Sequence, residues 1–338
     1  MIIQMKKIFL NLSIIFSILI ISCNQSGFSE KEKEENFSKL NELAYKIDND
    51  FIPIRNEVSK LADFIGYLYE NQDKNNCNDK KIYAISKDGV MYKTKDDGKS
   101  AVFVSGYTPI NEEIMKIVCF TEPLDTFFIR SIKEIPAIVQ LYYNDKYAYN
   151  RIYPFFDVLT QYEPKMNIPE FNFYYLADSV HNPEKKAVWV NEPYIDPAGR
   201  GWMVSAIAPV YYKNELVGVP GIDVTINNVT DKYFKSDNQD ILIIDASGVI
   251  VSANEQIINL LNLPPLKNHK YFETIKQDTY KKEDFNLLKN KNKNIRTAFE
   301  QIINNNSKFE QIQIDDKNYI IYVSILKELK WYIIKMTE

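Results

Sequence analysis

The sequence contains few of the residues on which metal sites and nucleophilic centres depend. Its 338 residues include two histidines, His181 and His269, and three cysteines, Cys23, Cys77 and Cys119. They form no Cys-x-x-Cys, His-x-x-x-His or His-Glu-x-x-His pattern. We therefore expect neither a zinc site nor a Cys–His nucleophilic pair, and the sequence suggests no other metal or cofactor.

Glycine and an excess of positive charge are also lacking. Only 10 glycines occur, and they form no glycine-rich phosphate loop. Lys and Arg number 41 against 45 for Asp and Glu, a net charge of −4, without the basic block that follows a nucleic-acid backbone. Nucleic acid is therefore disfavoured as a partner. Hydrophobic residues make up 45% and charged residues 25%, an ordinary globular composition, and the length suggests two domains.

The N-terminus has the pattern of an export signal. Lys6 and Lys7 precede a mostly apolar run, Ile8 to Ile21, which is shorter than the roughly 20 residues of a spanning helix. The run ends in Ile-Ile-Ser-Cys23, which resembles the bacterial lipobox, in which the cysteine is diacylated and the signal peptide is cleaved off directly before it. We expect a signal peptide over 1–22, a lipid anchor on Cys23 and a polar tether over 23–35. The alternative is an ordinary signal peptide with a chance cysteine.

Export would place the mature chain in an extracytoplasmic, oxidising compartment. Cys77 and Cys119 would then be the only side-chain pair left for a disulfide. The sequence leaves open whether they are bridged or remain buried thiols, because it does not show the distance between their Cα atoms.

Apolar residues at steps of three and four predict a long amphipathic helix over 36–75. They are Phe37, Leu40, Leu43, Ile47, Phe51, Ile54, Val58, Leu61, Phe64, Ile65 and Leu68. Pro53 would kink this helix or divide it in two. A coiled-coil dimer would use the same apolar stripe.

A weak internal repeat follows the helix. The run 82–92 resembles 241–251: each is an apolar segment, a polar turn ending in glycine, and a second apolar segment, as in a β-hairpin. Each copy closes with two β-rich runs, 202–212 with 216–226 and 319–325 with 331–336. We therefore expect an α+β fold with two related modules, each an antiparallel sheet with flanking helices.

One acidic residue, Asp223, lies inside an apolar strand, Val217-Gly-Val-Pro-Gly-Ile-Asp-Val224. A carboxylate there is unfavourable to bury unless it is paired or hydrogen-bonded. Alternation along the strand places Asp223 on the same face as Gly221. Asp223 either faces water or lines a pocket that binds a cation.

Tyr194-x-Asp196, with Asp223 27 residues later, resembles the ligand motif of double Cache domains, the extracellular sensor modules of bacterial receptors. The resemblance covers residues 30–338. It implies a long helix followed by two PAS-like modules, a membrane-distal ligand-binding module over 76–228 and a membrane-proximal module over 229–338.

In the amino-acid-binding branch of that family, Tyr194, Asp196 and Asp223 match the residues that hold the ammonium group. Arg151 and Tyr153 are the best match for the element that holds the carboxylate. This second half departs from the pattern, because the family has Trp where Tyr153 stands and a shorter spacing to Tyr194. An amine is therefore better supported than an amino acid.

Two of the candidate residues have structural alternatives. Arg151 could instead form a salt bridge with Asp157 or Asp145. Trp189 could wall the pocket, where it would attract an ammonium group by a cation–π interaction, or pack in the core.

The resemblance implies a lipid-anchored, extracytoplasmic protein that binds a small amine or amino acid without catalysis. Because the chain ends at Glu338, shortly after its last predicted strand, we expect it to relay binding to a separate membrane sensor or transporter. The alternative is an envelope interaction or adhesion protein that keeps the fold without a ligand.

Overall fold

The structure is a computed structural model that describes residues 29–74, 77, 80–195, 202–225, 232–233, 240–264 and 282–338. The predicted signal peptide and Cys23 lie outside the described residues, as does the predicted boundary at 228/229. Within the described residues, the contacts divide the chain between Lys39 and Leu40. None of the described helices is both long and apolar enough to cross a membrane.

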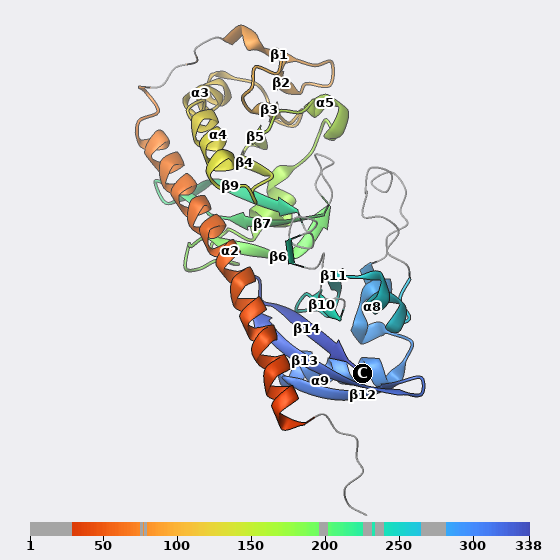
Figure 1. Cartoon of the computed structure of the whole chain (residues 1–338). Coiled ribbons are helices and arrows are strands. Elements are labelled where there is room, and N and C mark those ends of the chain that lie inside the picture. Colours follow the sequence, from red (N-terminus) through yellow and green to blue (C-terminus); the bar gives the residue numbers. More distant parts are fainter. Residues whose placement is uncertain are drawn as a thin grey trace, which may run out of the picture. The chain divides into compact units, whose positions relative to one another are not determined.

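The first described element is one helix, α2 (Glu30–Glu70), which continues through Pro53 (Figure 1). It begins earlier than predicted because Ser29 and Glu32 form a capping box: the Ser29 hydroxyl accepts from the Glu32 amide, and the Glu32 carboxylate accepts from the Ser29 amide. From Leu40 onwards its buried positions follow the predicted spacing of three and four residues.

The larger sheet is antiparallel and has nine strands in the order β1-β2-β3-β5-β4-β9-β7-β6, with β8 paired to β9. Its strands are β1 (Tyr83–Ile85), β2 (Met91–Lys93), β3 (Ala101–Val104), β4 (Gln140–Asp145), β5 (Tyr149–Tyr153), β6 (Val188–Ile195), β7 (Trp202–Ile207), β8 (Val210–Tyr212) and β9 (Glu215–Thr225).

Helices and 3₁₀ turns precede or connect these strands. They are the 3₁₀ turn η1 (Lys80–Ile82), α3 (Glu112–Phe120), α4 (Leu124–Glu134), α5 (Val158–Gln161), η2 (Ile168–Glu170) and α6 (Asn172–Tyr175). Asn111 caps α3 by accepting from the Ile114 amide, and Asp157 caps α5 by accepting from the Leu159 amide.

The second sheet has five antiparallel strands in the order β11-β10-β14-β13-β12. Its strands are β10 (Ile241–Ile244), β11 (Ile250–Ala253), β12 (Phe309–Ile314), β13 (Lys317–Leu326) and β14 (Trp331–Thr337). The helices that accompany it are α8 (Glu255–Leu260), η3 (Lys282–Phe285), η4 (Leu287–Lys289) and α9 (Lys293–Asn305).

The predicted repeat is confirmed at both hairpins. β1 pairs with β2, and β10 pairs with β11, both antiparallel. Gly89 and Gly248 end the two turns at φ values of 82° and 85°, where a side chain would be strained. The two sheets, each with its helices, are the α+β architecture that the sequence predicts.

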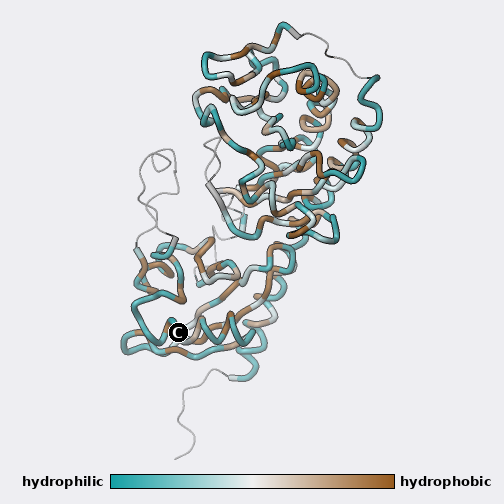
Figure 2. The backbone as a smooth tube through the Cα atoms, turned by 180° about the vertical axis from the view of Figure 1, so that it is seen from behind, coloured by the Kyte–Doolittle hydropathy of each residue, from teal (hydrophilic) through white to brown (hydrophobic). Residues whose placement is uncertain are grey.

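Each sheet buries an apolar cluster together with its helices. A cluster of the first sheet joins strands β3, β4, β5, β6, β7 and β9 to residues 158–177, and a cluster of the second joins its strands to α8 and α9. Figure 2 shows brown, hydrophobic segments within both sheets and teal, hydrophilic segments in many of the connecting loops. The face of the first sheet that carries this apolar cluster also carries the polar residues described next.

Candidate functional site

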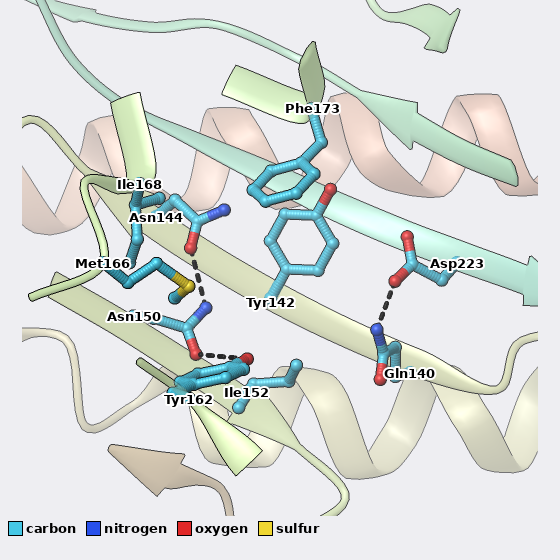
Figure 3. Close-up of a pocket in the computed structure, with 10 residues that line it drawn as sticks. All are labelled: Gln140, Tyr142, Asn144, Asn150, Ile152, Tyr162, Met166, Ile168, Phe173 and Asp223. Atoms are coloured by element: carbon cyan, nitrogen blue, oxygen red, sulfur yellow. Dashed lines mark hydrogen bonds between the residues drawn. The ribbon is translucent and has the colours of Figure 1, made fainter. Parts of the chain in front are cut away.

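One face of the first sheet forms a pocket beneath the segment 162–173 (Figure 3). Strands β4, β5 and β9 supply six lining residues, and the covering segment supplies four. The lining residues are Gln140, Tyr142, Asn144, Asn150, Ile152, Tyr162, Met166, Ile168, Phe173 and Asp223. The strand residues share this face because they alternate along each strand and pair in register, Gln140 with Asp223 and Asn144 with Asn150.

Asp223 is fully buried at one end of the pocket. Its carboxylate accepts hydrogen bonds from Gln140 Nε2 and from Ser205 Oγ, both on strands adjacent to β9. These donors compensate part of the free energy that burying a carboxylate requires. They also hold the carboxylate in place on the pocket face of the sheet.

Two amides and a phenol occupy the other end. Asn150 Nδ2 donates to Asn144 Oδ1 at 2.7 Å, and Tyr162 OH donates to Asn150 Oδ1 at 3.4 Å. In Figure 3 the amide nitrogen of Asn144 points away from Asn150, toward Tyr142 and Phe173. This end therefore carries uncharged hydrogen-bonding groups.

Aromatic rings separate the two ends. Tyr142 and Phe173 meet edge to face, with ring centroids 5.9 Å apart. Gly221 lies beneath the Tyr142 ring: a Cβ at this position would stand 2.1 Å from Tyr142 Cζ, so only glycine leaves the ring in place. The pocket thus consists of an acidic end, an aromatic and aliphatic middle, and an amide end.

The described residues contain no cluster of three or more His, Cys, Asp or Glu that could hold a metal ion.

No family model and no curated protein matches this sequence. Solved structures do match. The extracellular domain assigned to the histidine kinase soHK1S-Z6 aligns at 15% identity and a TM-score of 0.52, over 91% of this chain and 94% of that one. The sensory domain of the Campylobacter jejuni chemoreceptor Tlp3, solved with isoleucine bound, aligns at 10% identity and a TM-score of 0.51, over 92% and 98%.

The chain has the double Cache fold. At these identities the likeness shows the fold alone, so the ligand must be argued from the side chains of this chain. Of the residues that the sequence predicted as ligands in this double Cache fold, Asp223 lines the pocket.

Arg151 does not line the pocket, so its prediction as a carboxylate ligand is corrected. It lies between Asn150 and Ile152 on β5 and therefore faces the opposite side of the sheet. Its buried guanidinium meets Asp125 at 3.3 Å and donates to Val118 O and Tyr149 OH. The expected alternative, a salt bridge, is present, but its partner is Asp125 on α4.

Trp189 and Tyr153 also lie outside the pocket lining. The indole of Trp189 packs edge to face against Phe51 of α2 at 5.2 Å, and its Nε1 donates to Glu328 at 3.2 Å. The core alternative for Trp189 is therefore the one observed. Tyr153 shares with Arg151 the alternation that turns side chains away from the pocket.

The remaining candidates are only partly described. The backbone of Tyr194 pairs with Met203 between β6 and β7, but its side chain lies outside the described part of the chain, as does all of Asp196. Cys77 and Cys119 form a disulfide with their Cα atoms 4.4 Å apart, which settles the question that the sequence left open.

Five polar lining residues were not found from the sequence: Gln140, Tyr142, Asn144, Asn150 and Tyr162. Gln140, Tyr142 and Asn144 stand two residues apart, and this period of two was the available signal. It shows that the three share a face, but not that the same face carries Asp223.

Proposed function

We propose that this chain is a lipid-anchored, extracytoplasmic double Cache protein that binds a small amine-bearing solute and relays binding to a separate partner, with no chemistry on the ligand. The observation that carries the proposal is the buried carboxylate of Asp223 in a pocket with aromatic walls. An ammonium group has three donors and is best matched by a carboxylate beside other acceptors.

Two further observations support the cellular setting. The Ile-Ile-Ser-Cys23 sequence favours acylation of Cys23, and the disulfide of Cys77 and Cys119 fits an oxidising compartment. Two solved structures with this fold are the extracellular domain of a histidine kinase and the sensory domain of a chemoreceptor. Tyr194 and Asp196, which the motif assigns to the ammonium group, remain part of the proposal.

Relay would start from the strands that hold the acid. Asp223 accepts from Ser205 on β7, and Ser205 pairs with Val190 on β6. On either side of Val190, Trp189 donates to Glu328 and the Asn191 carbonyl accepts from Trp331, both residues of the second sheet's last hairpin. A change at the pocket that moves β6 would therefore reach the second sheet.

Thermal-shift measurements with a panel of amino acids and amines test the proposal. We expect one or a few amines to raise Tm by several degrees. Asp223→Asn, which keeps the shape of the side chain but removes its charge, should weaken binding at least tenfold, because charge-assisted hydrogen bonds contribute about 1.5–3 kcal/mol. Asp63→Asn, the same change on an exposed turn of α2, should leave binding intact.

A flat panel with correctly folded protein would contradict the proposal and favour the alternative role in envelope interaction or adhesion. Equal binding by Asp223→Asn and the unaltered chain would show that the ammonium group lies elsewhere.

A further inference from the structure

An amine beside Asp223 accounts for the acidic end of the pocket, but it gives no role to the amide end. We propose that this end selects the second functional group of the ligand, and that this group is uncharged: an amide or a hydroxyl, separated from the ammonium group by a short apolar chain. This inference rests on the proposed function, because it takes the ammonium group beside Asp223 as given.

The first step is the charge of the lining. In the part of the chain that the structure describes, the pocket lining carries one acidic residue, Asp223, and no Lys, Arg or His. The one arginine on a lining strand, Arg151, faces the other side of the sheet and meets Asp125. A ligand carboxylate at the amide end would be a buried negative charge with no cation of the described lining beside it, which is strongly unfavourable.

The second step is the hydrogen-bonding capacity of that end. Asn144 and Asn150 are almost completely buried, and their mutual hydrogen bond fixes the Asn144 oxygen toward Asn150. The two N–H donors of the Asn144 amide are then directed to the centre of the pocket, as Figure 3 shows. A carbonyl or hydroxyl oxygen is the matching acceptor, whereas an alkyl end would displace water from these donors without replacing its hydrogen bonds.

The third step is length. Asp223 pairs with Gln140, and Asn144 lies four residues further along β4, which is about 13 Å at about 3.3 Å per residue. Two hydrogen bonds of about 2.9 Å leave about 7 Å between the polar atoms of the ligand. The cavity between the two ends has a volume of about 20 Å³, because Tyr142 and Phe173 fill the middle, so a chain of about five carbons spans this distance only when these two rings move aside and line it together with Ile152.

Isothermal titration with five compounds of equal chain length tests the inference. They are pentylamine, 5-aminopentan-1-ol, 5-aminopentanamide, 5-aminopentanoate and 1,5-diaminopentane. We expect the amide and the alcohol to bind about tenfold or more tightly than pentylamine, and 5-aminopentanoate to bind more weakly than either.

Substitutions at the amide end identify the residue responsible. Asn144→Leu should remove the preference for the amide over pentylamine while pentylamine still binds. Asn144→Asp should shift the preference toward 1,5-diaminopentane, because it adds a carboxylate at this end. Asn56→Leu, on an exposed turn of α2, is the matched control and should bind all five compounds as the unaltered chain does.

The outcomes separate the two proposals. If none of these five compounds binds but another amine of the thermal-shift panel does, only the inference about the amide end falls; if no amine of either set binds, both fall. If the amines bind through Asp223 but with equal affinity, or if 5-aminopentanoate binds best, only the inference about the amide end falls. Should Asn144→Leu fail to fold, Tyr162→Phe, which removes one hydroxyl beside Asn150, provides the second variant and should reduce the preference for the amide.

Discussion

At the scale of single residues, Asp145 is a second buried carboxyl, and it titrates near neutral pH. It is fully buried at the end of β4, and its Oδ1 accepts from the amides of Tyr147 and Tyr149. Burial raises the pKa of Asp145 to about 7, and the two amide hydrogen bonds only partly oppose that effect. Its Oδ2 has no hydrogen-bond partner within the described residues.

This raised pKa predicts that stability falls as pH rises. The folded chain keeps the Asp145 proton up to about pH 7, whereas the unfolded chain releases it near its ordinary value of 3.8. Stability from this group is therefore full below about pH 3.8 and is lost as pH rises to about 7. An asparagine side chain at this position would be neutral at every pH in this range. We therefore expect Asp145→Asn to be more stable at pH 8, by up to about 4 kcal/mol, with the difference shrinking toward pH 4.

Urea unfolding at a series of pH values measures this difference. Asp63→Asn, on the exposed side of α2, is the control for a lost carboxylate and should stay parallel to the unaltered chain. Parallel curves for Asp145→Asn between pH 4 and pH 8 would show that Asp145 is ionised in the folded protein at acidic pH.

For single residues, the sequence indicated which side chains need a chemical explanation better than it indicated where those side chains lie in the fold. Asp223 could be found because a charge within an apolar strand requires a local explanation. Arg151 could not be placed, because its partner Asp125 lies 26 residues upstream and the spacing does not show which side of β5 faces a pocket. Asn144 and Asn150 look like ordinary strand residues until the register of β4 and β5 brings them together.

At the scale of elements, one of the two glycines in β9, Gly221, determines how the pocket is filled. Gly221 pairs across the strands with Tyr142, whose ring occupies the space of the missing Cβ. We expect Gly221→Ala to displace this ring and to destabilise the fold by about 1–3 kcal/mol, as overpacking does. Because Tyr142 lines the pocket, affinity for the amine should fall as well.

Gly66→Ala is the matched control for this substitution. Gly66 lies in α2, and apart from its chain neighbours and the backbone of its own helix no atom would stand within 4 Å of a Cβ there, so alanine should stabilise the helix by up to about 1 kcal/mol and leave binding unchanged. Thermal unfolding measures the change in stability, and titration with an amine that the thermal-shift panel identifies measures the change in affinity. Unaltered affinity in Gly221→Ala would show that the Tyr142 ring does not contact the ligand.

Elements with strong local signals were predicted well. The two hairpins follow from glycine at the turn and apolar runs on either side, and α2 follows from its apolar spacing. The ends of α2 were less accurate, Glu30 and Glu70 against a predicted 36–75, because its start depends on the Ser29–Glu32 capping box among polar residues. The order of strands in the first sheet depends on long-range pairing that no local pattern encodes.

At the scale of the whole molecule, one side chain joins α2, the first sheet and the second sheet. Glu328, in the connection between β13 and β14, accepts from Arg55 of α2 at 2.7 Å and from Trp189 of β6 at 3.2 Å. Asp48 of α2 accepts from the backbone amides of Lys327 and Glu328. These partners are up to 280 residues apart in the sequence, so this junction could not be predicted from the spacing of the residues.

Glu328→Ala should therefore weaken the cooperation between the two sheets. It leaves the guanidinium of Arg55 and the indole N–H of Trp189 without this acceptor, and we expect a loss of about 2 kcal/mol of stability. Urea unfolding followed by tryptophan fluorescence is suited to the measurement, because Trp189 and Trp331 both lie at the junction. Glu300→Ala, on an exposed position of α9, should leave the curve unchanged. If Glu328→Ala unfolds as the unaltered chain does, the hydrogen bonds at this junction do not couple the sheets, and a relay from the pocket through β6 would need another route.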